Sequence, residues 1–358
     1  MKAVLILVVL LAFCLKTRAD SITAEPIEPG REFAADSYVH KPLADDAPID
    51  PKSAAYVDNI QKQIKEHFGH ADVNIDAWSP PIYIVPAGQP TVRVKYVNPE
   101  SPASLFPALQ SQWMAVPLPN GFQPSSGTDL EAVVYQPSSG KMWEFWLMKK
   151  TGARTVDSIG KEVDEWGAKW GGRLDDIASN PGHWVTTPEG FKFGTTASGI
   201  PFLAGIMTIA ELKRGAINHV LGFSLPQTMA GHWSEPAQRT DGGTEGPNAI
   251  PEGTIFRLPA NMNLDAVEMD PFTRMIAKAV QKHGMIVWDI SGAAGFRAEN
   301  PANQYKDGHP YWKEGGILRC PKGADLPNNQ VIFKCWPPVR LQSFPWKELQ
   351  ALQVRLAK

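Results

Sequence analysis

Glu144 is the first candidate for acid–base chemistry, because it lies inside an aromatic run. The run is Trp143-Glu144-Phe145-Trp146, and its residue types favour a β-strand. Side chains alternate along a strand, so Met142, Glu144 and Trp146 share one face while Trp143 and Phe145 share the other. A carboxylate that its neighbours shield from water has a raised pKa, as a general acid requires. The alternative is a carboxylate that faces solvent or pairs with an arginine.

Three further side chains are candidate catalytic groups. His219 lies on the more apolar face of the alternating residues 216–225, either as a general base or as a core histidine bonded to the backbone. Asp289 follows the apolar residues 285–288, so it either points into a cleft or accepts backbone N–H groups in the next turn. Asp241 lies in a glycine-rich loop, where it either lines a site or forms an ordinary Asp-Gly turn.

The tryptophan content suggests a substrate. The chain has 12 tryptophans, and an aromatic face stacks on the apolar face of a sugar ring while its polar edge stays hydrated. The alternative is that these side chains simply pack between sheets. Arg257 lies between apolar neighbours and would pair with a carboxylate of the protein or of an acidic ligand. Asp129 either caps a strand or joins a polar site. The predicted substrate-binding residues are Trp143, Trp146, Trp288, Arg257 and Asp129.

Several function classes are excluded by motif and charge. The sequence has no P-loop, no G-x-G-x-x-G, no H-E-x-x-H, no C-x-x-C and no G-x-S-x-G. None of its eight histidines forms a pair at i, i+2 or i, i+4, so we expect no zinc site and no cofactor, while calcium on oxygen ligands stays open. The net charge of −2 gives no basic excess, which argues against a nucleic-acid partner.

The start of the chain predicts export. Lys2 precedes 13 apolar residues at positions 3–15, a run that is too short to span a membrane but typical of a signal peptide. Thr17 and Ala19 fit a cleavage site, so we predict a signal peptide at 1–19 and a secreted, extracellular protein without a membrane span. Two cysteines remain after cleavage, Cys320 and Cys335. An even pair in an exported protein indicates a disulfide bond, and two free thiols are the alternative.

Turn and cap residues predict the elements that position these side chains. Residues 20–50 show no periodicity and are expected to form an extended leader. A helix is expected from Asp50-Pro51 to Gly69, and a second from Asp270-Pro271 to Gly284. A hairpin is expected from residues 130–136 and 141–148 across a four-residue turn. Further predictions are strands at 206–212 and 331–336 and a terminal helix at 345–356.

Many short strands with frequent turn signals are typical of a β-sandwich or jelly roll. No regular alternation of strands and helices is visible, so a doubly wound fold is not expected. We therefore predict a mainly β, sandwich-like single domain at 51–358, with two or three peripheral helices and a C-terminal segment closed by the disulfide.

The chain also resembles a family of exported, mostly bacterial, single-domain β-sandwich proteins to which no reaction is assigned. The resemblance implies the fold and export only. Where relatives often carry Pro-Ala-x-His, this chain has Pro236-Ala237-Gln238-Arg239. The matching stretches are Gly127-Thr128-Asp129, Trp143-Glu144-Phe145-Trp146, residues 215–221, Pro236-Ala237-Gln238, Pro251-Glu252-Gly253-Thr254, the Arg257-Leu258 pair before Pro259, and residues 283–289.

Two functions fit these features. The first is a polysaccharide hydrolase or lyase that acts through Glu144, His219, Asp289 and Asp241 on a tryptophan-lined face. Hydrolysis requires two carboxylates about 5–10 Å apart, and a lyase would use a base together with Arg257 to neutralise a uronate. The second is a non-catalytic glycan-binding or extracellular-matrix protein. In both cases the expected partner is an extracellular polysaccharide or glycan.

Overall fold

The computed structural model describes residues 32–98, 105–186, 190–303, 309–313, 316–318 and 339–358. The predicted signal peptide, the strand at 331–336 and the cysteines Cys320 and Cys335 lie outside the described residues.

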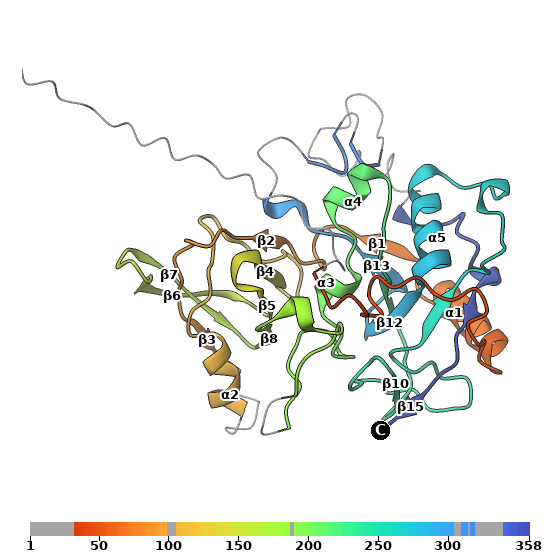
Figure 1. Cartoon of the computed structure of the whole chain (residues 1–358), viewed down its shortest axis with the longest axis horizontal. Coiled ribbons are helices and arrows are strands. Elements are labelled where there is room, and N and C mark those ends of the chain that lie inside the picture. Colours follow the sequence, from red (N-terminus) through yellow and green to blue (C-terminus); the bar gives the residue numbers. More distant parts are fainter. Residues whose placement is uncertain (1–31, 99–104, 187–189, 304–308, 314–315, 319–338) are drawn as a thin grey trace, which may run out of the picture.

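A mixed six-stranded sheet forms one half of the molecule (Figure 1), with the strand order β1-β13-β9-β12-β11-β14. β9 and β12 run parallel, as do β1 and β13, whereas the other neighbouring strands are antiparallel. Two helices, α1 and α5, supply apolar side chains to the core of this half. The bounds are β1 Asp72–Asn74, β9 Leu221–Leu225, β11 Ile255–Arg257, β12 Met285–Ile290, β13 Gly295–Arg297, β14 Gln350–Ala351, α1 Ser53–Glu66 and α5 Pro271–His283.

The other half contains a four-stranded sheet, β2-β4-β5-β8, and a three-stranded sheet, β3-β7-β6. A short pair, β10 with β15, lies beside the large sheet. The bounds are β2 Ile82–Ile84, β3 Val94–Tyr96, β4 Ala132–Gln136, β5 Lys141–Trp146, β6 Lys149–Val156, β7 Glu162–Ala168, β8 Trp170–Leu174, β10 Trp233–Ser234, β15 Leu356–Ala357, α2 Leu105–Gln112, α3 Phe202–Gly205 and α4 Ile209–Arg214.

Local sequence signals position the elements with the strongest caps and turns. α5 begins after Asp270, whose carboxylate accepts the N–H groups of Phe272 and Thr273, and it ends before Gly284. α1 also lies where the sequence predicts a helix. The β4–β5 hairpin is confirmed, with a 3₁₀ turn at Pro137–Ser139. The two faces of β5 separate as alternation predicts, because Trp143 and Phe145 join one apolar cluster and Met142 joins another.

Other expectations differ from the structure. The mainly β composition with few helices is confirmed, but a sandwich or jelly roll is not, because the sheets are open and mixed. The predicted strand at 206–212 is wrong: Thr208 and Glu211 form a reciprocal capping box that starts α4. The predicted terminal helix is also wrong. That segment has a 3₁₀ turn at Trp346–Glu348, followed by β14 and β15.

The described part of the predicted leader packs on the body of the protein. Phe33 and Val39 are buried, and the carbonyl of Val39 accepts the N–H of Val220 at 2.7 Å. Arg257 donates to the carbonyls of Ala44 and Asp45 at 2.7 and 2.6 Å. The described leader residues 32–50 therefore form part of the folded unit.

Trp288 on β12 joins the two halves through an apolar cluster that also contains Met142 and Phe202. Its ring lies over Gly222 of β9 so closely that a Cβ at Gly222 would overlap it. Gly205 of α3 is held in the same way, because its Cβ would lie 2.8 Å from the Trp288 ring and 2.7 Å from the Gly222 nitrogen. Glycine is therefore required where α3, β9 and Trp288 meet.

Replacing Gly222 by alanine should lower the free energy of unfolding by about 1–3 kcal/mol, because the added methyl group overpacks this contact. Urea unfolding would measure the change. Gly88→Ala is the matched control, since a Cβ there meets nothing within 4 Å, and it should change stability by about 0.5 kcal/mol or less. Equal effects of the two substitutions would contradict the packing constraint.

Candidate active site

Glu144 lies in the core rather than on an accessible face. Its side chain is 0% exposed. One carboxyl oxygen accepts the N–H of Phe202 at 2.6 Å and the other accepts the hydroxyl of Thr195 at 2.7 Å. Burial raises the pKa of Glu144 to about 8. These bonds join β5 to the start of α3, so the structure gives Glu144 a structural role.

His219 is also fully enclosed. Its Nδ1 lies 2.6 Å from the carbonyl of Val220 and its Nε2 lies 3.2 Å from Oε2 of Glu211. Both partners are acceptors, so both ring nitrogens must carry protons. Burial by itself lowers the pKa of His219, but the charge of Glu211 outweighs it and the net shift is upward. Burial by itself raises the pKa of Glu211, and His219 likewise reverses that shift. The pair ties α4 to the residues before β9 and faces no surface.

Three predicted substrate-binding residues are buried as well. Trp143 donates its indole N–H to the carbonyl of Gln112 at 3.1 Å, and Trp288 donates to the hydroxyl of Ser224 at 3.1 Å. Arg257 binds the two leader carbonyls described above, not a carboxylate, which corrects the sequence-based expectation for its partner. None of the three presents a face for stacking or ion pairing.

Asp289 does lie at a partly open position, where its side chain is 15% exposed. The pairing of β12 with β9 shifts register between Val287 and Asp289. Plain alternation would turn Asp289 to the same face as Val287, into the core covered by α5. The irregularity instead lets it face Arg297, as β-bulges commonly re-aim a side chain. Its Oδ1 also accepts the N–H of Ala197 at 3.3 Å.

Arg297 is the buried cation of this site. It donates to both oxygens of Glu131 at 2.8 and 2.7 Å and to Asp289 at 3.4 Å. Its guanidinium lies 5.1 Å from the centre of the Phe202 ring. Burial raises the pKa of Glu131 to about 7, although Arg297 opposes that shift. Burial also raises the pKa of Asp289, to about 6, and Arg297 opposes the shift there too.

Asp129 and Trp146 form a half-buried rim next to this group. The indole N–H of Trp146 donates to Oδ1 of Asp129 at 3.3 Å. The charge of Asp129 also acts on Glu131 and Arg297, which places it beside the buried ion group. Of the predicted aromatic binding residues, Trp146 is therefore the one that stays partly accessible next to carboxylates.

A carboxyl pair completes the site. Glu252 is 0% exposed, and its Oε1 accepts the hydroxyl of Thr228 at 3.2 Å. Its Oε2 has no hydrogen-bond donor among the described residues, but the exposed side chain of Asp241 lies within hydrogen-bonding reach. Two carboxyl groups in contact need a shared proton. Burial, and then the charges of Asp241 and Asp289, raise the pKa of Glu252 to about 9.

Arg239 fixes the loop that lies over Asp289. Its guanidinium donates only to backbone carbonyls, among them those of Gly194 at 2.9 Å, Thr196 at 2.8 Å and Ala197 at 3.0 Å, with Lys192 and Phe193 as the remaining partners. The same loop provides the Ala197 N–H for Asp289. Arg239 therefore positions the backbone of the site, and its charge also lies near Asp241, Glu252 and Asp289.

The structure thus brings together Asp129, Trp146, Asp241 and Asp289 from the predicted set and leaves Glu144, His219, Trp143, Trp288 and Arg257 in the interior. Sequence reasoning missed Glu131, Arg239, Glu252 and Arg297. Glu252 lies in a quoted motif, Pro251-Glu252-Gly253-Thr254, but nothing in its spacing shows that Asp241 would contact it. Glu131 precedes the apolar strand β4, which was a weak sign of burial.

The described ranges contain no group of three or more His, Cys, Asp or Glu side chains arranged to hold a metal ion. Within the same ranges, no helix is both long enough and apolar enough to cross a bilayer. Comparison of the chain with protein-family models, with curated proteins and with solved structures finds no match. The geometry of the site therefore carries the functional argument.

Glu144 gives a pH test of the structural assignment. Its carboxyl keeps a proton in the native state up to about pH 8, whereas the unfolded chain loses that proton near pH 4.5. The free energy of unfolding should therefore fall as pH rises between those values. The side-chain amide introduced by Glu144→Gln mimics the protonated acid and does not titrate. Between these pH values the free energy of unfolding of the variant should therefore fall less steeply than that of the native protein, by up to about 1.4 kcal/mol per pH unit.

Chemical unfolding at several pH values would measure the slope. The exposed Glu268→Gln is the matched control and should leave it unchanged. A native slope that survives in Glu144→Gln would mean that Glu144 is ionised in the folded protein.

Proposed function

We propose that the chain is a secreted polysaccharide hydrolase, with the Asp241–Glu252 pair as proton donor and Asp289 as base. The observation that carries this proposal is an exposed carboxyl group within hydrogen-bonding reach of a fully buried one, beside a third carboxyl that is 15% exposed. Glycoside hydrolysis requires one carboxyl that keeps its proton near neutral pH and one that has lost it. Burial and mutual repulsion separate the pKa values of Glu252 and Asp289 in that sense.

The proposed step follows from these protonation states. The proton shared by Asp241 and Glu252 passes through the exposed Asp241 to the glycosidic oxygen as the bond to the anomeric carbon breaks. Asp289 takes a proton from water, and that water forms the new bond to the anomeric carbon. Arg297 and the N–H of Ala197 each hold one oxygen of Asp289, which fixes the orientation of this carboxyl group for proton transfer.

Binding of the substrate would use the accessible rim. Trp146 offers a partly exposed aromatic surface, and Asp129 offers a carboxylate for sugar hydroxyl groups. Glu144 and His219 take no part in this mechanism, because both are enclosed. The non-catalytic interpretation, a glycan-binding or matrix protein, is the competing outcome of the experiment below.

Neutral and acidic soluble polysaccharides, incubated with the chain from residue 20 onward, should yield new reducing ends with at least one of them. Asp289→Asn and Asp241→Asn should each lower kcat by about 10²–10⁴-fold while the fold is kept. Glu144→Gln is the matched carboxyl-to-amide control and should keep its turnover. Loss of activity in Glu144→Gln but not in Asp289→Asn would overturn the assignment, and so would unsaturated uronate products. Polysaccharide binding without any product would establish the non-catalytic interpretation.

The activity should follow a bell-shaped pH profile. It should rise with pH as Asp289 loses its proton near pH 6, and fall as the Asp241–Glu252 pair loses its proton near pH 9. Glu252→Gln removes the buried carboxyl that keeps its proton up to about pH 9, so the alkaline limb should move to lower pH. Initial rates from pH 4 to pH 10 would measure both limbs. An alkaline limb that stays in place in Glu252→Gln would contradict the role of the pair.

A further inference from the structure

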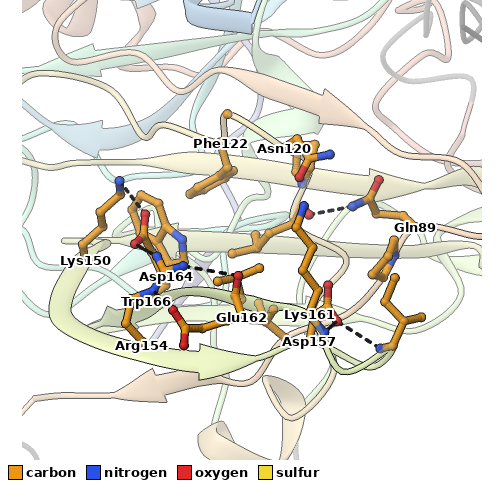
Figure 2. Close-up of a pocket in the computed structure, with 17 residues that line it drawn as sticks. Gln89, Asn120, Phe122, Lys150, Arg154, Asp157, Lys161, Glu162, Asp164 and Trp166 are labelled. Carbon is orange, nitrogen blue, oxygen red and sulfur yellow. Dashed lines mark hydrogen bonds and ion pairs between the residues drawn. The ribbon is translucent and has the colours of Figure 1, made fainter.

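A groove of about 410 Å³ lies on the three-stranded sheet, apart from the carboxyl site. The β6–β7 hairpin forms one wall, and the segments 89–92 and 118–122 form the other (Figure 2). Figure 1 shows β6 and β7 at one end of the molecule, whereas β10 and β12 lie in the other half. A ligand held in this groove would therefore not contact Asp241, Glu252 or Asp289, and none of these lines it.

The charges that line the groove cancel. Lys150, Arg154 and Lys161 face Asp157, Glu162 and Asp164. Lys150 binds Asp164 at 2.7 Å, and Arg154 binds Glu162 at 3.0 Å as well as Asp164. A phosphate or a uronate entering the groove would meet as many carboxylates as cations, so the lining favours a neutral ligand over an anion.

Several polar groups in the groove remain available to a ligand. Among the described residues, none forms a hydrogen bond or ion pair with the ammonium group of Lys161 or with the side-chain amide of Asn120, and both residues line the groove. The amide N–H of Gln89 donates to the carbonyl of Leu118 at 2.7 Å, which leaves its oxygen as an acceptor. Figure 2 shows Gln89, Asn120 and Lys161 toward one end of the groove, and Lys150, Asp164 and Trp166 toward the other end. Donors and acceptors therefore occur together, as hydroxyl groups require.

The groove also has an apolar floor. Trp166 and Phe122 meet edge to face with their ring centres 5.0 Å apart, and Val92, Leu118 and Val163 extend this surface. Ile159, at the tip of the β6–β7 hairpin, is 73% exposed. An apolar floor beneath paired charges and free amides matches a molecule with C–H faces and hydroxyl edges. The volume lies in the range of about 300–1,000 Å³ that is usual for small-ligand sites.

We propose that this groove is a second, non-catalytic binding site for a neutral oligosaccharide segment of a polysaccharide. It would hold the polymer at one end of the molecule, independently of any chemistry at Asp289. The inference does not depend on the proposed hydrolase activity, since a purely binding protein would use the same groove.

Affinity electrophoresis of the chain from residue 20 onward tests the proposal. Native gels would contain laminarin, xyloglucan or galactomannan as neutral probes and alginate or polygalacturonate as acidic probes. We expect at least one neutral probe to retard migration of the protein, and we expect the dissociation constants for the acidic probes to be at least tenfold larger. Asn120→Ala/Lys161→Ala should weaken the neutral interaction at least tenfold. The matched control, Asn261→Ala/Lys62→Ala, removes an exposed amide and an exposed ammonium group elsewhere and should bind normally.

Asp289→Asn separates this site from the carboxyl site. Retention of binding in Asp289→Asn, together with its loss in Asn120→Ala/Lys161→Ala, would support the groove whether or not any product forms. Trp166→Phe gives a second test that keeps an aromatic floor, and it should bind more weakly without unfolding. The proposal is overturned if no neutral probe is retarded, if acidic probes bind equally well, or if only Asp289→Asn loses binding.

Discussion

The ion group around Arg297 is the constraint on which the arrangement of the two halves depends. Arg297 belongs to β13 of the large sheet, whereas Glu131 directly precedes β4 of the four-stranded sheet. A buried guanidinium needs carboxylate partners, and removing one partner of such a pair costs about 3–5 kcal/mol. Arg297 donates to Glu131 of one half and to Asp289 of the other half. The ring of Phe202 covers its guanidinium. The relative position of the sheets and the orientation of Asp289 are thereby fixed together.

The register shift at Trp288 is what makes this ion group possible. It turns Asp289 toward Arg297. Trp288 keeps the face that it shares with Ile286 by alternation, and its indole packs between α3 and β9, where only glycine fits at 205 and 222. Two adjacent residues of β12 thus make the apolar contact and the polar contact between the halves. Arg239 acts from the other side, because it holds the loop whose Ala197 N–H restrains Asp289. The end of β12, the buried Arg297 and the loop that contains Ala197 thus all restrict the carboxyl group of Asp289.

The sequence predicts features that local chemistry decides. Asp270, Pro271 and Gly284 specify α5 within one stretch of chain, and four residues specify the turn between β4 and β5. Thr208 and Glu211 carried an equally local helix signal, but the surrounding apolar run suggested a strand.

The enclosure of Glu144 depends on α3, some 58 residues away, and that of His219 depends on α4. Asp289 and Asp241 could be suspected from strand-end and loop positions. Glu131 and Arg297, 166 residues apart, are brought together only by the tertiary fold.

Both proposed sites contain carboxyl groups, but those groups differ in whether they keep a constant charge near neutral pH. In the groove, bonds from Lys150 and then from Arg154 lower the pKa of Asp164, so this carboxylate stays ionised and its charge is constant. At the carboxyl site, burial exceeds the available cationic charge, and Glu252 and Asp289 take up protons within the working pH range. A group with constant charge can only bind, whereas a group that gains and loses a proton near neutral pH can also transfer it. Polysaccharide retention and bond cleavage would then respond differently to pH: retention would change little between pH 6 and pH 9, while turnover would be limited at both ends of that interval.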